Sequence, residues 1–203
     1  MSAPNLDGLP ELTWSHGAGQ WEHTDAGLTL ISAPEVDWIT HATGGDLPSA
    51  QTLDATSLMF TPKGDFQFSA RVQVPGPRTT YDAGVLTLWA DAEHWAKLCF
   101  EYSPQGQAMV VTVVTNGYSD DTNSWVIDGD AVYLRISRLG AAYAFHASAD
   151  GNKWDFVRLF RLSTTDPVSV GMMSQAPTGP TCITHFSDIT FSATTLTDLR
   201  DGS

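Results

Sequence analysis

Residues 95–102 read WAKLCFEY, and this stretch decides which class of fold the sequence predicts. Every second position carries a side chain suited to a core: Ala96, Leu98 and Phe100. The positions between them form a polar row with an aromatic end: Trp95, Lys97, Cys99 and Glu101. Because successive side chains of a β-strand point to opposite faces, this period of two predicts a strand with one face in a core.

Alternating or β-branched segments of this kind recur along the chain, each bounded by Gly, Pro, Asn or Asp. The predicted strands are residues 21–22, 27–32, 55–61, 65–74, 82–90, 95–102, 108–115, 131–138, 141–149, 153–162, 168–174 and 182–193. Residues 40–52 and 116–123 are polar and predict loops, and a short helical turn is expected at residues 91–93. Many short strands at this spacing predict an all-β, two-sheet antiparallel sandwich.

The length and composition favour one domain. All-β domains of about this length often stay undivided, and 42% hydrophobic residues are enough for a substantial core. We find no tandem repeat and no break in composition. We therefore expect a single domain over residues 1–193, followed by a loose C-terminal tail at residues 194–203, which lack a strand pattern.

The formal net charge of −13 restricts the choice of partners. A field of this sign repels phosphate backbones and anionic lipid surfaces, so neither nucleic acid nor a membrane is an expected partner. No apolar run approaches the ~20 residues of a membrane helix. Residues 1–14 lack the basic and apolar regions of a secretory signal, which favours a cytoplasmic location. Cys99 and Cys182 are then expected to be reduced thiols.

Several short phrases occur in an order that a known family shares. They are residues 30–38 with Asp37-Trp38, Gly64-Asp65-Phe66, Tyr81-Asp82-Ala83-Gly84, residues 95–101, Val113-Val114-Thr115, and Arg138 followed by residues 148–154. From about Trp14 to Phe191 the chain resembles a concanavalin A-like family of domains of unknown function, named for a fungal regulation-of-enolase protein. The resemblance implies a concanavalin A-like jelly roll.

Three places depart from the family's pattern. They are Cys99, where the family's Trp-Lys-Gly-Glu run has glycine, Trp125, which is displaced from Ser119-Asp120-Asp121, and Ala176-Pro177, where Ser-Pro is common. These changes weaken any transfer of ligand contacts. The family has no settled activity, but related sandwich modules sit beside glycoside hydrolase domains or bind sugars. By that analogy the resemblance implies a carbohydrate ligand.

Two further segments repeat the division into core and polar positions. Arg135 lies between the apolar Leu134 and Ile136, and His146 lies between Phe145 and Ala147. If these strands adjoin residues 95–102, one concave sheet face displays Trp95, Lys97, Glu101, Arg135 and His146.

On such a face, Trp95 would stack on a sugar ring while Lys97, Glu101 and Arg135 hydrogen-bond its hydroxyl groups. Trp38 and Trp125, placed on loops at the mouth, would close over the ligand. The alternative is that these charges form ion pairs on a sheet face, each worth about 0.2–1 kcal/mol when exposed.

The leading hypothesis is a non-catalytic domain that binds a carbohydrate or another small polar ligand. One alternative is a glycan-modifying enzyme, which needs two carboxylates about 5–9.5 Å apart. Glu101 with Asp82, or with Asp37, is the candidate pair, and no catalytic residue is assigned beyond that. The other alternative, suggested by the family's name, is a regulatory domain that binds a metabolic enzyme. It predicts an exposed apolar patch of several hundred Å².

No cofactor and no metal are expected. The loop aspartates Asp120, Asp121, Asp128 and Asp130 lack the spacing of an EF-hand. The histidines are scattered without a close pair, so a zinc site would need distant strands. A glycine-rich phosphate loop and a Gly-x-Ser-x-Gly nucleophile turn are also missing from the sequence.

Overall fold

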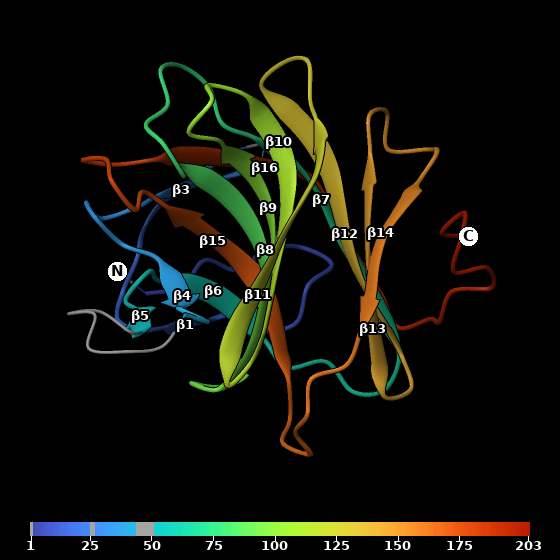
Figure 1. Ribbon diagram of the computed structural model, residues 1–203. Coiled ribbons are helices and arrows are strands. Elements are labelled where there is room, and N and C mark those ends of the chain that lie inside the picture. The colour runs from blue at the N-terminus through green and yellow to red at the C-terminus, as the bar shows by residue number, and fades with distance from the viewer. Residues whose placement is uncertain (1, 25–26, 44–50) are drawn as a thin grey trace.

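The computed structural model describes residues 2–24, 27–43 and 51–203. In these ranges it has no helix, and two seven-stranded sheets pack face to face (Figure 1). Every paired neighbour in the two sheets is antiparallel. The predicted all-β, two-sheet sandwich is therefore confirmed.

The two sheets divide the chain as follows. In spatial order the first sheet contains β1 (Thr13–Ser15), β6 (Ser57–Phe60), β15 (Ser169–Gln175), β8 (Ala83–Asp91), β9 (His94–Tyr102), β10 (Ala108–Asn116) and β11 (Tyr118–Val126). The second contains β14 (Asp155–Phe160), β13 (Ala142–Ser148), β12 (Ala131–Leu139), β7 (Phe66–Gln73), β16 (Ile183–Ser192), β3 (Gly27–Ile31) and β2 (Gln20–Thr24). A two-stranded ribbon of β4 (Trp38–Thr40) and β5 (Gln51–Leu53) lies outside the first sheet (Figure 1).

The core between the sheets is built by the alternation seen in the sequence. Leu98 and Phe100 of β9 and Leu134 and Ile136 of β12 are fully buried members of one cluster. Each such side chain contributes about 1.5–3 kcal/mol by leaving water. Packing is tight enough that a Cβ at Gly84 would lie 2.4 Å from the Thr184 methyl group, so this position requires glycine.

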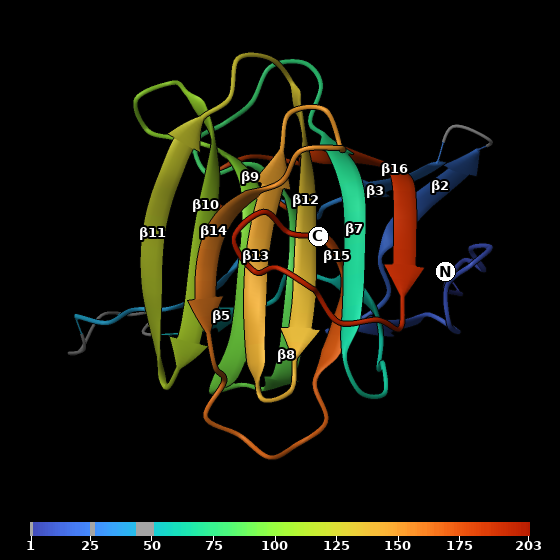
Figure 2. The same cartoon turned by 90° about the vertical axis from the view of Figure 1, so that its right-hand side faces the viewer.

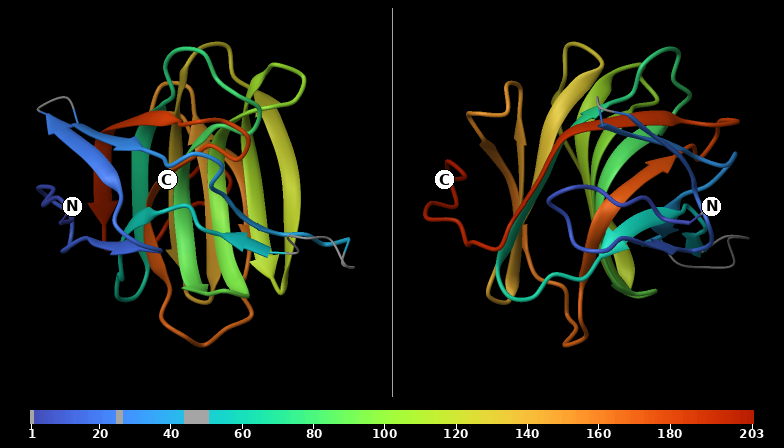
Figure 3. Two further views of the ribbon diagram at one scale, coloured as in Figure 1. Left: turned by 90° about the vertical axis from the view of Figure 1, so that its left-hand side faces the viewer. Right: turned by 180° about the vertical axis from the view of Figure 1, so that it is seen from behind.

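A second, smaller cluster covers part of the outer face of the first sheet. Trp95 and Cys99 point to this outer side and are fully buried, because Trp38 and Ala55 pack over them. Figure 3 (left) looks onto this face, where the blue and cyan N-terminal segments cross the strands. The strand β9 is thus covered on both sides at one end, although its sequence alternates.

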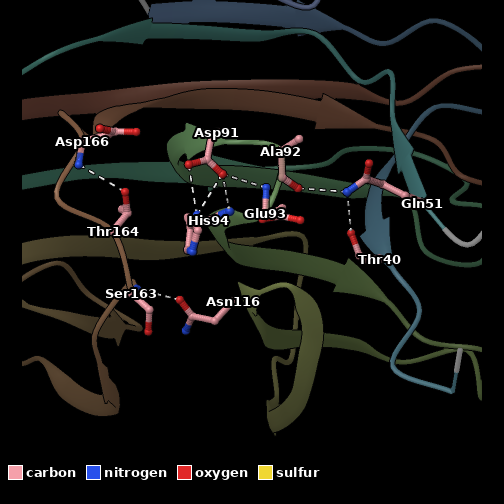
Figure 4. Close-up of polar contacts among 10 residues, drawn as sticks. All are labelled: Thr40, Gln51, Asp91, Ala92, Glu93, His94, Asn116, Ser163, Thr164 and Asp166. Carbon is pink, nitrogen blue, oxygen red and sulfur yellow. Dashed lines mark hydrogen bonds and ion pairs between the residues drawn. The ribbon is translucent and has the colours of Figure 1, made fainter.

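Three local predictions are wrong. Residues 116–123 belong largely to the edge strand β11 and not to a loop. An edge strand exposes both of its faces, so Ser, Thr and Asp occupy consecutive positions and the alternation disappears. Residues 91–93 form a hairpin turn instead of a helical one, with the Asp91 carboxylate accepting hydrogen bonds from the backbone of Glu93 and His94 (Figure 4).

The third wrong prediction concerns residues 40–52, whose two ends form the ribbon. The Gln51 amide donates to the Ala92 carbonyl at 2.9 Å and to the Thr40 hydroxyl at 3.1 Å, which ties the ribbon to the β8–β9 hairpin (Figure 4). Residues 44–50 of the predicted loop lie outside the described residues.

Residues 194–203 contain no strand, as expected, yet they are not a loose tail. They cross the outer face of the second sheet over β12 and β13 (Figure 2). Leu196 and Gly202 are buried there, and the Leu199 carbonyl lies 2.8 Å from the His146 Nε2 atom.

Candidate functional site

The outer face of the first sheet carries a cleft of about 610 Å³ where the N-terminal segments leave it uncovered. Strands β9, β10 and β11 form its floor. Its charged lining consists of Glu35, Asp37, His41, Lys97, Glu101 and Asp121. Met109, Val111 and Val113 of β10 supply an apolar strip along the middle of the floor. Sequence reasoning placed Lys97 and Glu101 on one face, and the structure places both in this cleft.

Lys97 is a buried cation with ordered partners. Its side chain is 3% exposed, and its Nζ lies 2.7 Å from a carboxylate oxygen of Asp37 and 3.0 Å from the Gln175 side-chain oxygen. Burial is the largest single influence and lowers the pKa of Lys97, but attraction by Asp37, Cys99 and Glu101 and the hydrogen bond to Asp37 together outweigh it, so the net pKa is raised. An ammonium group has three N–H donors, so one remains without a partner among the described residues.

Glu101 lines the same cleft in a different state. Burial raises the pKa of this carboxyl to about 7, with Lys97 opposing the rise and Asp37 and Asp121 adding to it. In the described part of the chain no hydrogen bond or salt bridge engages the Glu101 carboxyl. The Glu101 carboxyl is therefore partly desolvated and has no protein partner within the described ranges, so it can accept a hydrogen bond from a ligand.

The third carboxyl of the floor comes from the edge strand. Lys97 pairs with Val113 across β9 and β10, and Val113 pairs with Asp121 across β10 and β11. Residues that are directly opposite on neighbouring strands share a face, so Asp121 is on the same side as Lys97. Loss of water around the Asp121 carboxyl raises its pKa, Lys97 opposes the rise, and repulsion from Asp37 adds to it.

One end of the cleft is formed by a strained turn. Tyr81 has a positive φ of 69°, which is unusual for a residue with a side chain. Its N–H donates to the Tyr102 carbonyl at 2.7 Å, and its carbonyl accepts a hydrogen bond from Gln175 at 3.3 Å. Tyr81 as a whole is 41% exposed, and it lines the cleft. This arrangement connects an exposed aromatic ring to the Lys97 network through Gln175.

The tryptophans that sequence reasoning placed in the site do not reach it. Trp95 is fully buried, with its ring centroid 6.0 Å from that of Trp38. Trp38 is also fully buried, in β4 and not on a loop, and its Nε1 donates to the Ala55 carbonyl. Trp125 lies in β11 and packs against the core between the sheets. No exposed ring of these three is available to stack on a ligand or close over it.

Arg135 and His146 lie on the outer face of the other sheet, in β12 and β13. The condition for a common face, adjacency to β9, is not met, because β9 neighbours only β8 and β10. An Arg135 Nη atom donates to the Gly202 carbonyl, and the guanidinium lies 4.1 Å from the centroid of the Trp154 ring. The predicted five-residue face is therefore divided between two surfaces.

The Asp82 carboxylate does not share the cleft with Glu101, although Ala83 lies directly opposite Glu101 in the sheet. Asp82 is 3% exposed, and its carboxylate accepts a hydrogen bond from the Thr79 N–H at 2.7 Å. Burial raises the pKa of Asp82. The carboxylate faces Gly179 and does not line the cleft. The alternative partner, Asp37, does lie in the cleft, but it is bound to Lys97.

Sequence reasoning missed Asp121, Gln175 and Tyr81 as site residues. Asp121 was considered only as a loop carboxylate, and its register with Lys97 depends on recognising β11 as a strand. Gln175 comes from β15, about eighty positions from Lys97 in the sequence, so no local pattern connects them. Tyr81 belongs to the motif Tyr81-Asp82-Ala83-Gly84, which indicates the family and its fold but does not by itself indicate a binding residue.

Two further properties of the described ranges bear on the site. They hold no group of three or more His, Cys, Asp or Glu side chains arranged to bind a metal ion. They also contain no helix with the length and hydrophobicity needed to cross a membrane.

The fold and the cleft define a β-sandwich protein with an open polar site on one sheet face, and comparison with known proteins gives its family. Residues 14–194 match the family described as "Protein of unknown function (DUF1349)". The chain therefore belongs to this family. Comparison with curated proteins gave no match.

Solved structures with the same fold include a functionally unknown protein from Saccharomyces cerevisiae. It is 26% identical, with a TM-score of 0.77, and the match covers 90% of this chain and 96% of that one. The carbohydrate binding module CBM66 from Bacillus subtilis is 13% identical over 88% of this chain and 94% of its own, with a TM-score of 0.54.

A GH43 protein from Bacillus licheniformis is also similar in fold. It is 12% identical over 82% of this chain, with a TM-score of 0.63. The match covers 33% of the GH43 chain, so this chain spans about a third of that protein's length.

Proposed function

We propose that this chain binds a carbohydrate, or a similarly hydroxylated small ligand, in the cleft of the first sheet and catalyses no reaction on it. The observation that carries the proposal is the combination of Lys97 and Glu101. Lys97 is held in place by Asp37 and Gln175 and retains a donor, while Glu101 is an unengaged acceptor. A sugar hydroxyl group both donates and accepts, so neighbouring hydroxyl groups can satisfy this pair.

The size and lining of the cleft support the proposal. A volume of about 610 Å³ is within the usual range for small-molecule sites. The strip of Met109, Val111 and Val113 offers an apolar surface for the C–H face of a sugar ring. Tyr81 provides the exposed aromatic ring that the buried Trp95 does not. The similarity in fold to a carbohydrate binding module adds support by analogy.

No observation favours either alternative function. The enzyme hypothesis paired Glu101 with Asp82 or with Asp37, but Asp82 does not line the cleft and Asp37 is bound to Lys97. The regulatory hypothesis predicts a continuous apolar patch. The large hydrophobic side chains exposed in the described ranges are Tyr81, Tyr118, Val126, Leu159 and Ile183. Tyr118 and Val126 are the two ends of β11, and the other three belong to different segments. Regulation of enolase, a protein partner and a cytoplasmic location remain predictions.

A broad glycan-binding screen of the purified chain tests the proposal. Glu101→Ala removes the acceptor, and Tyr81→Ser removes the exposed ring. We expect each variant to bind a glycan from the screen at least about tenfold more weakly than the wild type, because each loses about 1.4 kcal/mol or more of contact energy. Asp128→Asn, at an exposed position outside the cleft, is the matched control and keeps wild-type affinity.

Two results would contradict the proposal. One is a wild-type chain that is folded, by circular dichroism, and binds nothing across the screen. The other is a glycan that binds equally well to Glu101→Ala, Tyr81→Ser and the Asp128→Asn control, because the ligand would then occupy a different surface.

A further inference from the structure

We infer that the cleft selects sugars by charge and prefers a sugar that carries a protonated amino group to its neutral counterpart, and both to a uronic acid. This inference rests on the proposed function and assigns a ligand class to the same site.

The charges of the cleft do not balance. Its lining contains four carboxyl groups, from Glu35, Asp37, Glu101 and Asp121, against one lysine and one histidine. Asp37 holds the Lys97 ammonium group at 2.7 Å and neutralises it. Within the described ranges no salt bridge engages Glu35, Glu101 or Asp121. The floor therefore presents unpaired acidic groups to any ligand that enters.

Glu101 makes this imbalance specific to the site. Its carboxyl is the most strongly desolvated of the three unpaired groups, and burial raises its pKa to about 7. A ligand hydroxyl group offers it a neutral hydrogen bond. A ligand ammonium group offers a charge-assisted bond and restores the ionised carboxylate, which burial alone disfavours. A ligand carboxylate offers Glu101 no donor and is repelled by the other acidic side chains of the cleft.

The acidity of the whole chain does not produce the same selection. A net charge of −13 creates a diffuse field, which salt screens over about 8 Å at physiological ionic strength. A direct contact with a partly buried carboxyl is screened much less. A preference set by Glu101 should persist at 0.3 M salt and disappear when glutamine, which cannot ionise, replaces that one group.

The experiment uses three tetrasaccharides with one β-1,4-linked glucose-type backbone. They are cellotetraose, the glucosamine tetramer with an amino group on each ring, and the glucuronate tetramer with a carboxylate on each ring. Affinities are measured by calorimetry at pH 6.5 and 0.3 M salt. We compare the wild type, Glu101→Gln and the control Glu22→Gln, whose exposed glutamate lies in β2 of the other sheet.

For the wild type we expect the glucosamine tetramer to bind about tenfold more tightly than cellotetraose, the usual gain of a charge-assisted over a neutral hydrogen bond. The glucuronate tetramer should bind most weakly. Glu101→Gln can form only neutral hydrogen bonds, so the ratio of the glucosamine-tetramer affinity to the cellotetraose affinity should fall to about one. Glu22→Gln should retain the wild-type order.

The inference is overturned by any of three results: no detectable binding of the glucosamine tetramer, binding of cellotetraose as tight as that of the glucosamine tetramer, or a preference for the amine that Glu101→Gln retains. Failure of this inference can be distinguished from failure of the proposed function. If neutral glycans bind to the wild type and more weakly to Glu101→Ala, the cleft is supported as a sugar site even when the amine gives no advantage. If no glycan of the broad screen binds, both the inference and the proposed function are contradicted.

Discussion

The two outer faces of the sandwich carry similar rows of polar side chains, but one face is open beside its row and the other is covered. On the first sheet, Lys97 is paired with a carboxylate, Asp37, and the surface beside it remains an open cleft. On the second sheet, Arg135 is buried with a neutral acceptor, the Gly202 carbonyl, and residues 194–203 cover it. In the described ranges no carboxylate forms a salt bridge with Arg135.

This difference shows that a polar row on a strand does not define a binding face. Alternation determines which side chains turn away from the core, and it does so correctly for Lys97, Glu101 and Arg135. Whether that outward side is open depends on segments far away in sequence. Here these are Val36, Trp38 and Ala55 on one face and residues 194–203 on the other.

The largest effect is expected from Lys97→Met. This change leaves the Asp37 carboxylate and the Gln175 oxygen without their common donor. Removing one partner of a buried ion pair costs about 3–5 kcal/mol, and the lower end applies because the Asp37 side chain is 20% exposed. Urea unfolding at pH 7 measures the loss, with the exposed Lys153→Met as control. A loss below about 1 kcal/mol would contradict a tightly coupled pair.

A smaller effect, dependent on pH, is expected from Glu101→Gln. The folded-state pKa of Glu101 is raised from 4.5 to about 7, so the folded chain binds more protons than the unfolded chain between these values. The wild type therefore loses stability as pH rises from about 4.5 through 7. Asp121, whose pKa is also raised, acts in the same direction. Asp37, Lys97 and Arg78 are the other charged groups that act on the Glu101 carboxyl.

Glu101→Gln removes the contribution of Glu101 alone. We expect the variant to gain about 2 kcal/mol over the wild type between pH 4.5 and pH 8, measured as the difference of two urea-unfolding series. A difference that stays constant across this range would show that the carboxyl is not buried as described.

The smallest loss is expected from Arg135→Met. The change removes one hydrogen bond to a carbonyl and the contact with Trp154, but it leaves no opposite charge unpaired. We expect a cost of about 1 kcal/mol, below that of Lys97→Met. Faster amide exchange of Gly202, whose N–H donates to the Asp198 carbonyl, should accompany it. A cost equal to that of Lys97→Met would erase the proposed distinction between the two faces.

Most of the fold was predictable because a strand that buries one face alternates apolar and polar residues along its sequence. The strands β9, β12 and β13 show it plainly, and their core residues follow from it. The edge strand β11 was missed because solvent on both faces removes the pattern. Short strands such as β1 and β4 contain only three residues, too few for any period to be recognised.

The site was predictable only in part. Lys97 and Glu101 follow from alternation on one strand. Asp121 and Gln175 belong to other strands, and the register of the sheet determines that they lie near Lys97 and Glu101. The burial of Trp95 depends on Trp38, which packs against it from the ribbon. The sheet to which β12 belongs, and hence the place of Arg135, depends on topology, which alternation does not contain.

The most direct test of the central claim, that the ligand occupies the open face and not the covered one, is an NMR titration of the labelled chain. The titrant is the tightest glycan from the screen. The account predicts that the largest amide shifts occur at Tyr81, Lys97, Glu101 and Asp121, while those of Arg135 and Gly202 stay unchanged. Shifts concentrated at Arg135 and Gly202, with the cleft unaffected, would contradict it.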